Sequence, residues 1–171
     1  MSESREPTRA GLTGLARDLI VGWALVGGLL VVAVVLINVY SIAAGALFNK
    51  PFAGDFELTQ MGIGVAVFCF LPYCQLVGAN VSADIFTSHA GPRTLALLSI
   101  LAGLIAILFS ALLIWRMSAG LSDYIEYPEI TGVLSIPLWW AFLPALVSLA
   151  LLLVASCLTL QAALLDLRKA G

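Results

Sequence analysis

Residues 19–44 read LIVGWALVGGLLVVAVVLINVYSIAA and contain no Asp, Glu, Lys or Arg. A helix rising about 1.5 Å per residue needs about 20 apolar residues to cross the ~30 Å hydrocarbon core of a bilayer. The stretch is therefore long enough to span a membrane. Its apolar side chains are continuous rather than alternating, which argues against a strand of an outer-membrane barrel. This segment predicts a transmembrane helix.

The rest of the chain repeats the pattern three times. The charged residues that bracket the four uncharged windows are Asp18 and Lys50, Glu57 and Asp84, Arg93 and Arg116, and Glu129 and Asp166. The shortest window holds 22 residues, which is about 33 Å of helix. Each window fits one span, and none is long enough for two spans and a turn. The expected spans are Leu19–Ala44, Leu58–Ala79, Thr94–Trp115 and Leu138–Leu160.

The composition of all 171 residues agrees with four spans. Hydrophobic residues make up 61% of the chain, charged residues only 11%, and the mean hydropathy is +1.07. Soluble domains carry about 25% charged residues, so a soluble enzyme, a nucleic-acid binder and a disordered chain are excluded. Backbone groups in lipid must bond within the chain, which favours helices. We expect one membrane domain over residues 1–171, an all-α integral membrane protein built as a four-helix transmembrane bundle.

The basic residues predict the orientation of this bundle. With four spans, one side holds Arg5, Arg9, Arg17, Arg93, Arg168 and Lys169, and the other side holds only Lys50 and Arg116. By the positive-inside rule, both termini are expected in the cytoplasm. The other face would carry an acidic rim of Asp55, Glu57, Asp123, Glu126 and Glu129. Residues 44–46 fit a signal-peptide cleavage site, but the apolar stretch before them is about twice the usual 7–15 residues, so we expect the first span to be retained.

The chain has no residue pattern typical of an active site or a metal site. Its uncharged windows hold few polar groups, among them Asn38 and Gln75, whereas ion-coupled transporters place charged or broken-helix sites at depth. Small multidrug exporters depend on a glutamate in the first span. The first span of this chain contains no carboxylate, so the chain resembles these exporters in span count alone. The three cysteines form no CxxC pair, and HExxH, P-loop and GxGxxG patterns are missing. We expect no catalytic residue, no bound metal and no cofactor.

Two segments beside the spans are more informative. The first is Phe56-Glu57-Leu58-Thr59-Gln60, which opens the second span, with Asp84 after that span. The second is TGVLSIPLWW at residues 131–140, which opens the fourth span. With four spans and this length, these segments resemble the small membrane subunit of tripartite ATP-independent periplasmic (TRAP) transporters, the DctQ family. That family often has a histidine where this chain has Asn80, so no role of that histidine is carried over.

The resemblance implies a multi-pass subunit of the bacterial inner membrane. Its partners would be a large multi-span TRAP permease subunit, a periplasmic solute-binding protein and the lipid bilayer, with no nucleic acid. In that family the binding protein captures a solute, usually an organic acid, and the large subunit moves it with an ion gradient, typically of sodium. The small subunit resembles a non-catalytic scaffold for the static part of an elevator-type transporter.

The residues that we expect to contact a partner subunit or to anchor helix ends are Glu57, Gln60, Asp84, Pro137, Trp139 and Trp140. Anchoring at the membrane interface alone would explain the same residues. Two other functions remain open. An anchor or assembly subunit of a different membrane complex would copurify with other partners, and a self-contained small transporter would support flux alone in liposomes. The sequence names neither the solute nor the coupling ion, and it leaves open which helices face a partner.

Overall fold

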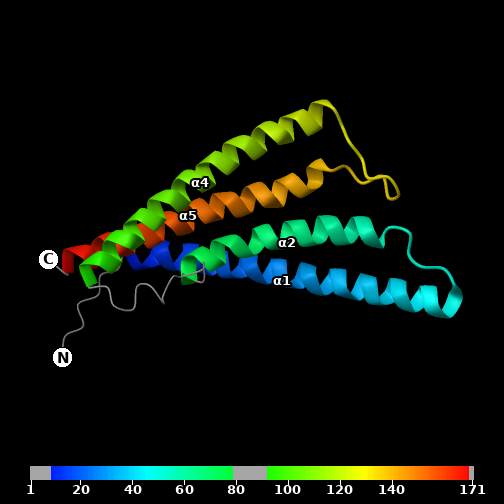
Figure 1. The fold of residues 1–171 in the computed structure, drawn as a ribbon, viewed down its shortest axis with the longest axis horizontal. Coiled ribbons are helices and arrows are strands. Elements are labelled where there is room, and N and C mark those ends of the chain that lie inside the picture. The colour runs from blue at the N-terminus through cyan, green and yellow to red at the C-terminus, as the bar shows by residue number, and fades with distance from the viewer. Residues whose placement is uncertain (1–8, 79–91, 170–171) are drawn as a thin grey trace.

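The computed structural model describes residues 9–78 and 92–169, most of which lie in four helices (Figure 1). The helices are α1 (Arg9–Phe48), α2 (Asp55–Val77), α4 (Pro92–Glu126) and α5 (Trp139–Lys169). Each is long and apolar enough to cross a membrane. The expected all-α fold with four membrane-spanning helices is confirmed. The predicted site residue Asp84 lies outside the described residues.

The helices are arranged side by side in the order α1, α2, α5 and α4 (Figure 1). Helix α2 packs against α1 and α5, α5 packs against α4, and α1 meets α5 over a smaller area. Helices α1 and α4 thus form the two edges, and α4 leans away from α2 toward its C-terminal end (Figure 1). The row is more open than a compact four-helix bundle. Lipid tails are as apolar as leucine side chains, so exposing an apolar helix face to lipid costs no hydrophobic free energy. The hydrophobic effect therefore does not drive the four helices into a compact bundle.

Helices α1 and α2 end in left-handed caps. Asn49 follows α1 with a φ of 54°, and its backbone N–H donates to the carbonyl of Gly45 at 3.0 Å. Gly78 follows α2 with a φ of 67°, and its N–H donates to the carbonyls of Cys74 and Gln75. This conformation is easy for glycine and tolerable for asparagine, and it satisfies carbonyls that the helix leaves without a donor.

Small residues bring α1 and α2 close together. A Cβ placed on Gly27 would lie 2.7 Å from the Cβ of Cys69, and one placed on Gly62 would lie 2.5 Å from a methyl group of Val34. Both distances are below van der Waals contact. Because only glycine leaves this space, the α1–α2 interface depends on these two positions. Small residues commonly allow such close approach between membrane helices.

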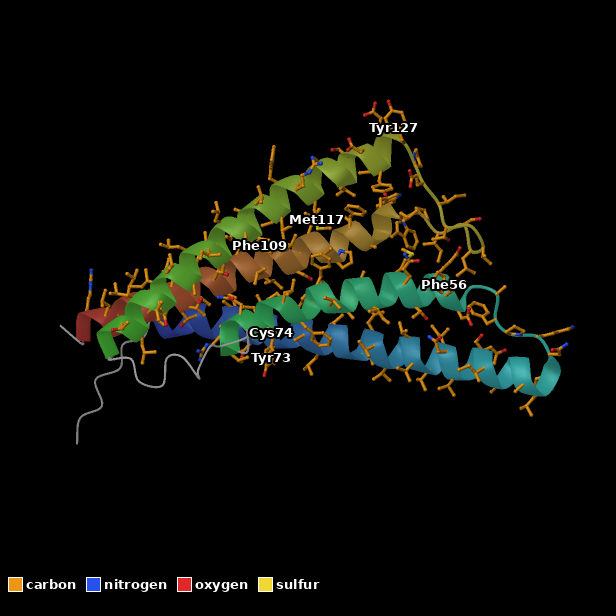
Figure 2. The ribbon with its side chains drawn as sticks, in the orientation of Figure 1. Phe56, Tyr73, Cys74, Phe109, Met117 and Tyr127 are labelled. Atoms are coloured by element: carbon orange, nitrogen blue, oxygen red, sulfur yellow. The ribbon has the colours of Figure 1, made fainter. Side chains whose placement is uncertain are left out.

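The buried core is small and partly polar. Four fully buried side chains are serines: Ser41, Ser110, Ser148 and Ser156. Ser110 and Ser156 donate to carbonyls of their own helices, those of Ile107 at 3.0 Å and Leu152 at 2.8 Å. A hydroxyl in hydrocarbon finds no water, so a local carbonyl is the partner at hand. Large apolar side chains such as Phe56 and Phe109, both labelled in Figure 2, are instead exposed.

Candidate functional site: the junction of α2 and the 129–138 hairpin

The segment between α4 and α5 folds into a short hairpin over residues 129–138. The N–H of Leu138 donates to the carbonyl of Glu129, and the N–H of Thr131 donates to the carbonyl of Ile136, both at 3.0 Å. The N–H of Ile136 donates in turn to the hydroxyl of Thr131 at 3.0 Å. Ser135 takes a left-handed φ of 53° at the bend. The second segment singled out from the sequence is therefore a closed turn.

The carboxylate of Glu57 holds the tip of this hairpin. Its Oε1 accepts the N–H of Val133 at 2.7 Å, and its Oε2 accepts the N–H of Leu134 at 2.9 Å. Hydrogen bonds from backbone amides to a charged carboxylate are stronger than those between neutral groups. Glu57 also lies in the first turn of α2, where the helix dipole favours a negative charge. One side chain thus joins the start of α2 to the segment that leads into α5.

Gly54, the residue before α2, packs against the same hairpin. A Cβ on Gly54 would lie 2.4 to 2.6 Å from three carbon atoms of the Leu134 side chain. Gly54 is buried although it lies outside the helices. Because Gly54 has no side chain, it leaves the space into which the Leu134 side chain inserts. Leu134 is also a residue whose backbone N–H donates to Glu57.

A second polar contact connects the end of α1 to the start of α2. The hydroxyl of Ser41 donates to Oδ2 of Asp55 at 2.5 Å and accepts the N–H of Phe52 at 3.1 Å. Asp55 also accepts the N–H of Phe56 through Oδ1 at 2.7 Å. Sequence reasoning placed Asp55 only in the acidic rim. Its position in the first turn of a helix was the available signal for a structural contact, but nothing in the sequence pointed to Ser41.

The remaining predicted site residues lie on both sides of this junction. Helix α5 begins at Trp139, so Pro137 precedes the helix, and it pairs with Ile130 across the hairpin. The rings of Trp139 and Trp140 meet edge to face with centroids 6.1 Å apart. Trp140 is 57% exposed. Gln60, one turn along α2 from Glu57, is exposed, and no hydrogen bond joins it to the hairpin in the described part of the chain.

Polar side chains also meet between the helices at greater depth. The Nε1 of Trp23 on α1 donates to the Oγ of Ser148 on α5 at 2.8 Å. The Nδ2 of Asn38 on α1 donates to the hydroxyl of Thr59 on α2 at 2.6 Å. None of these groups ionises, so they join helices without placing a charge between them. Within residues 9–78 and 92–169, no three His, Cys, Asp or Glu side chains come close enough to hold a metal ion.

Five of the ten acidic residues lie at one end of the molecule. Asp123 and Glu126 are exposed near the end of α4, and Glu129 is exposed in the hairpin. This is also the end where α1 finishes and α2 begins, so Asp55 and Glu57 lie there too (Figure 1). The structure therefore groups the acidic residues that the four-span prediction assigns to a single face.

Comparison with known proteins identifies the family. The profile of the family described as "Tripartite ATP-independent periplasmic transporters, DctQ component" matches residues 31–166. No individual curated protein matches the chain significantly. The matched region includes α2, the Glu57 junction and the hairpin, together with α4, most of α5 and the second half of α1. Four membrane-spanning helices and this match show that the chain is an inner-membrane protein of the DctQ family, a component of TRAP transporters.

Proposed function

We propose that this chain is the small, non-catalytic permease subunit of a TRAP-type secondary transporter. It would scaffold a large multi-span subunit. That subunit would use an ion gradient to take up an organic acid, which a periplasmic binding protein delivers. The chain would carry out no enzymatic reaction. The family match over residues 31–166 is the observation that supports this assignment.

The distribution of charge supports a scaffold rather than a transport pathway. The four uncharged windows of the sequence contain no Asp, Glu, Lys or Arg, and the side-chain hydrogen bonds that join helices within these windows use neutral groups, such as Trp23 with Ser148. Coupling transport to an ion gradient normally requires charged or broken-helix sites near the middle of the bilayer. We infer that solute and ion bind on another subunit.

Glu57 would act by shaping the protein rather than by contacting the partner directly. Both of its carboxylate oxygens already accept amides of the hairpin. The exposed residues around the junction, Gln60 and Trp140, are better placed to meet the large subunit or lipid headgroups. We propose that Trp139 and Pro137 set the direction in which α5 leaves the hairpin. Asp84 keeps its proposed role as an anchor of the far end of α2.

The deciding experiment is a pull-down of the tagged chain from native membranes in a mild detergent, with partners identified by mass spectrometry. We expect a large multi-span permease in stoichiometric amount. Recovery of unrelated membrane subunits would instead favour an assembly or anchor role in another complex. Recovery of the chain alone, followed by solute flux in liposomes that contain only this chain, would support a self-contained transporter.

Variants can locate the contact surface in the same assay. Trp140→Ala and Gln60→Ala should reduce recovery of the large subunit while the chain itself stays in the membrane. Val32→Ala, at an exposed position on α1 away from the hairpin, is the control and should leave recovery unchanged. Equal recovery with all three variants would exclude the junction as the contact surface.

A further inference from the structure

The contacts between helices show which residues lie at the same level along the row. The hydroxyl of Ser41 on α1 meets the carboxylate of Asp55 on α2. Farther along the same pair of helices, Gly27 lies against Cys69. The hydroxyl of Ser148 on α5 lies 3.8 Å from the sulfur of Cys69. The uncharged segments of the helices can therefore be compared along one axis.

On the side of the hairpin, the uncharged segment of α1 extends beyond the start of α2. Helix α1 continues from Ser41 to Phe48, which is about 10 Å past the level of Asp55. Figure 1 shows this overhang at the cyan end of α1. Its side chains include Leu47 and Phe48, which are 76% and 73% exposed. A membrane surface at right angles to α1 and α2 would leave these apolar side chains in water.

On the same side, the uncharged segment of α4 ends much earlier. Gly120 on α4 lies against Phe142 on α5, and Arg116 comes one turn before Gly120. Because α4 and α5 run in opposite directions, Arg116 is close to the level of Ser148 and the middle of α2. Arg116 is exposed, and none of the described residues forms an ion pair with it.

An exposed arginine at that level is incompatible with an upright row of helices. A charged side chain at the centre of a bilayer is costly. Side chains on a helix lean toward its N-terminus, which for α4 is the end far from the hairpin, so the side chain of Arg116 does not extend toward the nearer membrane surface. The membrane surface on the hairpin side must therefore cross α4 near Arg116.

The opposite end of the row shows a displacement in the same direction. Asp18 on α1 lies nine residues before Gly27, which places it level with the end of α2. Gly103 on α4 reaches nearly the same level through its contact with Leu160 on α5. The uncharged segment of α4 starts earlier, at Thr94, and so begins about 10 Å beyond the level of Asp18. From α1 to α4, both ends of the uncharged segment shift away from the hairpin.

The lengths of the uncharged segments indicate the tilt. On α4 the segment covers residues 94–115, which are 22 residues and about 33 Å of helix. An upright helix of this length matches a hydrocarbon core of ~30 Å. On α1 the segment covers residues 19–48, which are 30 residues and about 45 Å. To cross the same thickness, α1 has to tilt by roughly 40°.

We propose that the row of helices crosses the bilayer obliquely, with α4 nearly upright and α1 tilted by roughly 40° in the plane of the row. The surface in contact with lipid is then a diagonal band, which on the hairpin side ends near Lys50 on α1 and near Arg116 on α4. The rest of α4, with Asp123 and Glu126, stands in water, whereas the tip of α1 stays in lipid. This placement does not depend on which protein partner the chain has.

Spin labels at three similarly exposed positions test the oblique crossing. Leu29, Leu47 and Trp115 are 71%, 76% and 68% exposed. Leu29 and Trp115 lie at nearly the same level of the row. Leu29→Cys, Leu47→Cys and Trp115→Cys are made singly in the full chain after its native cysteines are replaced by Ala. Each variant is labelled and placed in liposomes, and electron paramagnetic resonance measures its collision rate with a water-soluble nickel chelate.

The proposal predicts one ranking of these collision rates. The rates at Leu47→Cys and Trp115→Cys should agree within about twofold, because both labels lie near the same membrane surface. Both should exceed the rate at Leu29→Cys by at least about fivefold. Equal rates at Leu29→Cys and Trp115→Cys, far below that at Leu47→Cys, would show an upright row and overturn the proposal. Any other ranking would also contradict it.

The tilt of α1 can be measured without any substitution. Valine is abundant in α1 and does not occur in α4, so solid-state nuclear magnetic resonance of the chain labelled with ¹⁵N-valine in oriented bilayers reports mainly on α1. We expect a tilt near 40°, and a tilt below about 30° would contradict the proposal. This measurement decides the question if circular dichroism shows that a cysteine variant does not fold. Neither experiment depends on the outcome of the pull-down.

Discussion

At the scale of single residues, Glu57 has the most specific surroundings in the molecule. It was expected to mark the start of a helix and to face a partner or headgroups. It lies in the first turn of α2, and its two oxygens accept the N–H groups of Val133 and Leu134, residues more than seventy positions away in the chain. The two segments that suggested the family from sequence are thus one structural unit. A carboxylate suits this pairing, because each of its two oxygens accepts one of two adjacent N–H groups.

Replacing Glu57 by Gln tests this pairing. The amide side chain keeps one acceptor oxygen but places an NH₂ group against an N–H donor. We expect faster hydrogen exchange at Val133 and Leu134 and a lower temperature of unfolding. Hydrogen exchange with mass spectrometry measures the first, with Glu126→Gln, at an exposed site on α4, as the control. Unchanged exchange at both amides would show that the carboxylate does not hold the hairpin.

The hydrogen bond from Trp23 to Ser148 gives a second prediction at this scale. It joins α1 to α5, whose interface is otherwise small. A double-mutant cycle with Trp23→Phe and Ser148→Ala should yield a coupling of about 0.6 kcal/mol, the average measured for hydrogen bonds between membrane helices, and no more than about 1.7 kcal/mol, the largest value measured. Unfolding in mixed micelles supplies the four free energies. Additive effects of the two substitutions would show that this bond contributes nothing to stability.

At the scale of elements, each interface of the row is organised differently. Helices α1 and α2 approach closely through glycines, whereas α2 and α5 are also joined through the hairpin. Pro144 lies inside α5, one turn before Ser148. The hydroxyl of Ser148 donates to the backbone carbonyl of Pro144 at 2.7 Å. Ser148, which accepts the indole N–H of Trp23, is therefore oriented by a hydrogen bond within its own helix. Polar contacts position the helices, and small residues set their spacing.

Two adjacent glycines of α1 form a matched test of this spacing. A Cβ on Gly27 would lie 2.7 Å from Cys69, whereas a Cβ on Gly28 meets nothing within 4 Å. Gly27→Ala should lower the free energy of unfolding by about 1 to 3 kcal/mol through overpacking. Gly28→Ala should change it by less than about 1 kcal/mol, since only helix propensity differs. Unfolding curves of both variants decide the matter, and equal effects would contradict the close approach of α1 to α2.

At the scale of the whole molecule, the apolar length of α1 exceeds the thickness of a bilayer. The uncharged part of α1, residues 19–48, holds 30 residues and is about 45 Å long, against a hydrocarbon core of ~30 Å. A helix of this length is accommodated by tilting. Because α1 packs along α2, the row as a whole would tilt with it.

Orientation in the membrane is the prediction that belongs to this scale. The six basic residues on the side of the termini favour a cytoplasmic location for both ends. A green fluorescent protein fused after Gly171 should fluoresce, and an alkaline phosphatase fused at the same point should be inactive. Active phosphatase without fluorescence would reverse the predicted orientation and move the acidic end of the molecule into the cytoplasm.

The number and type of the helices followed from the sequence by itself. A bilayer demands long uncharged segments with internal hydrogen bonds, and this demand is local, so the windows between charged residues were sufficient to count four helices. The family resemblance likewise rested on short stretches such as residues 131–140. Only the tertiary structure decided which helices are neighbours and what Glu57 binds. Lipid solvates every apolar face equally well, so hydrophobicity does not specify the neighbours. They are set instead by a few close contacts and hydrogen bonds, such as those of Gly27, Trp23 and Glu57, whose partners lie far away along the chain.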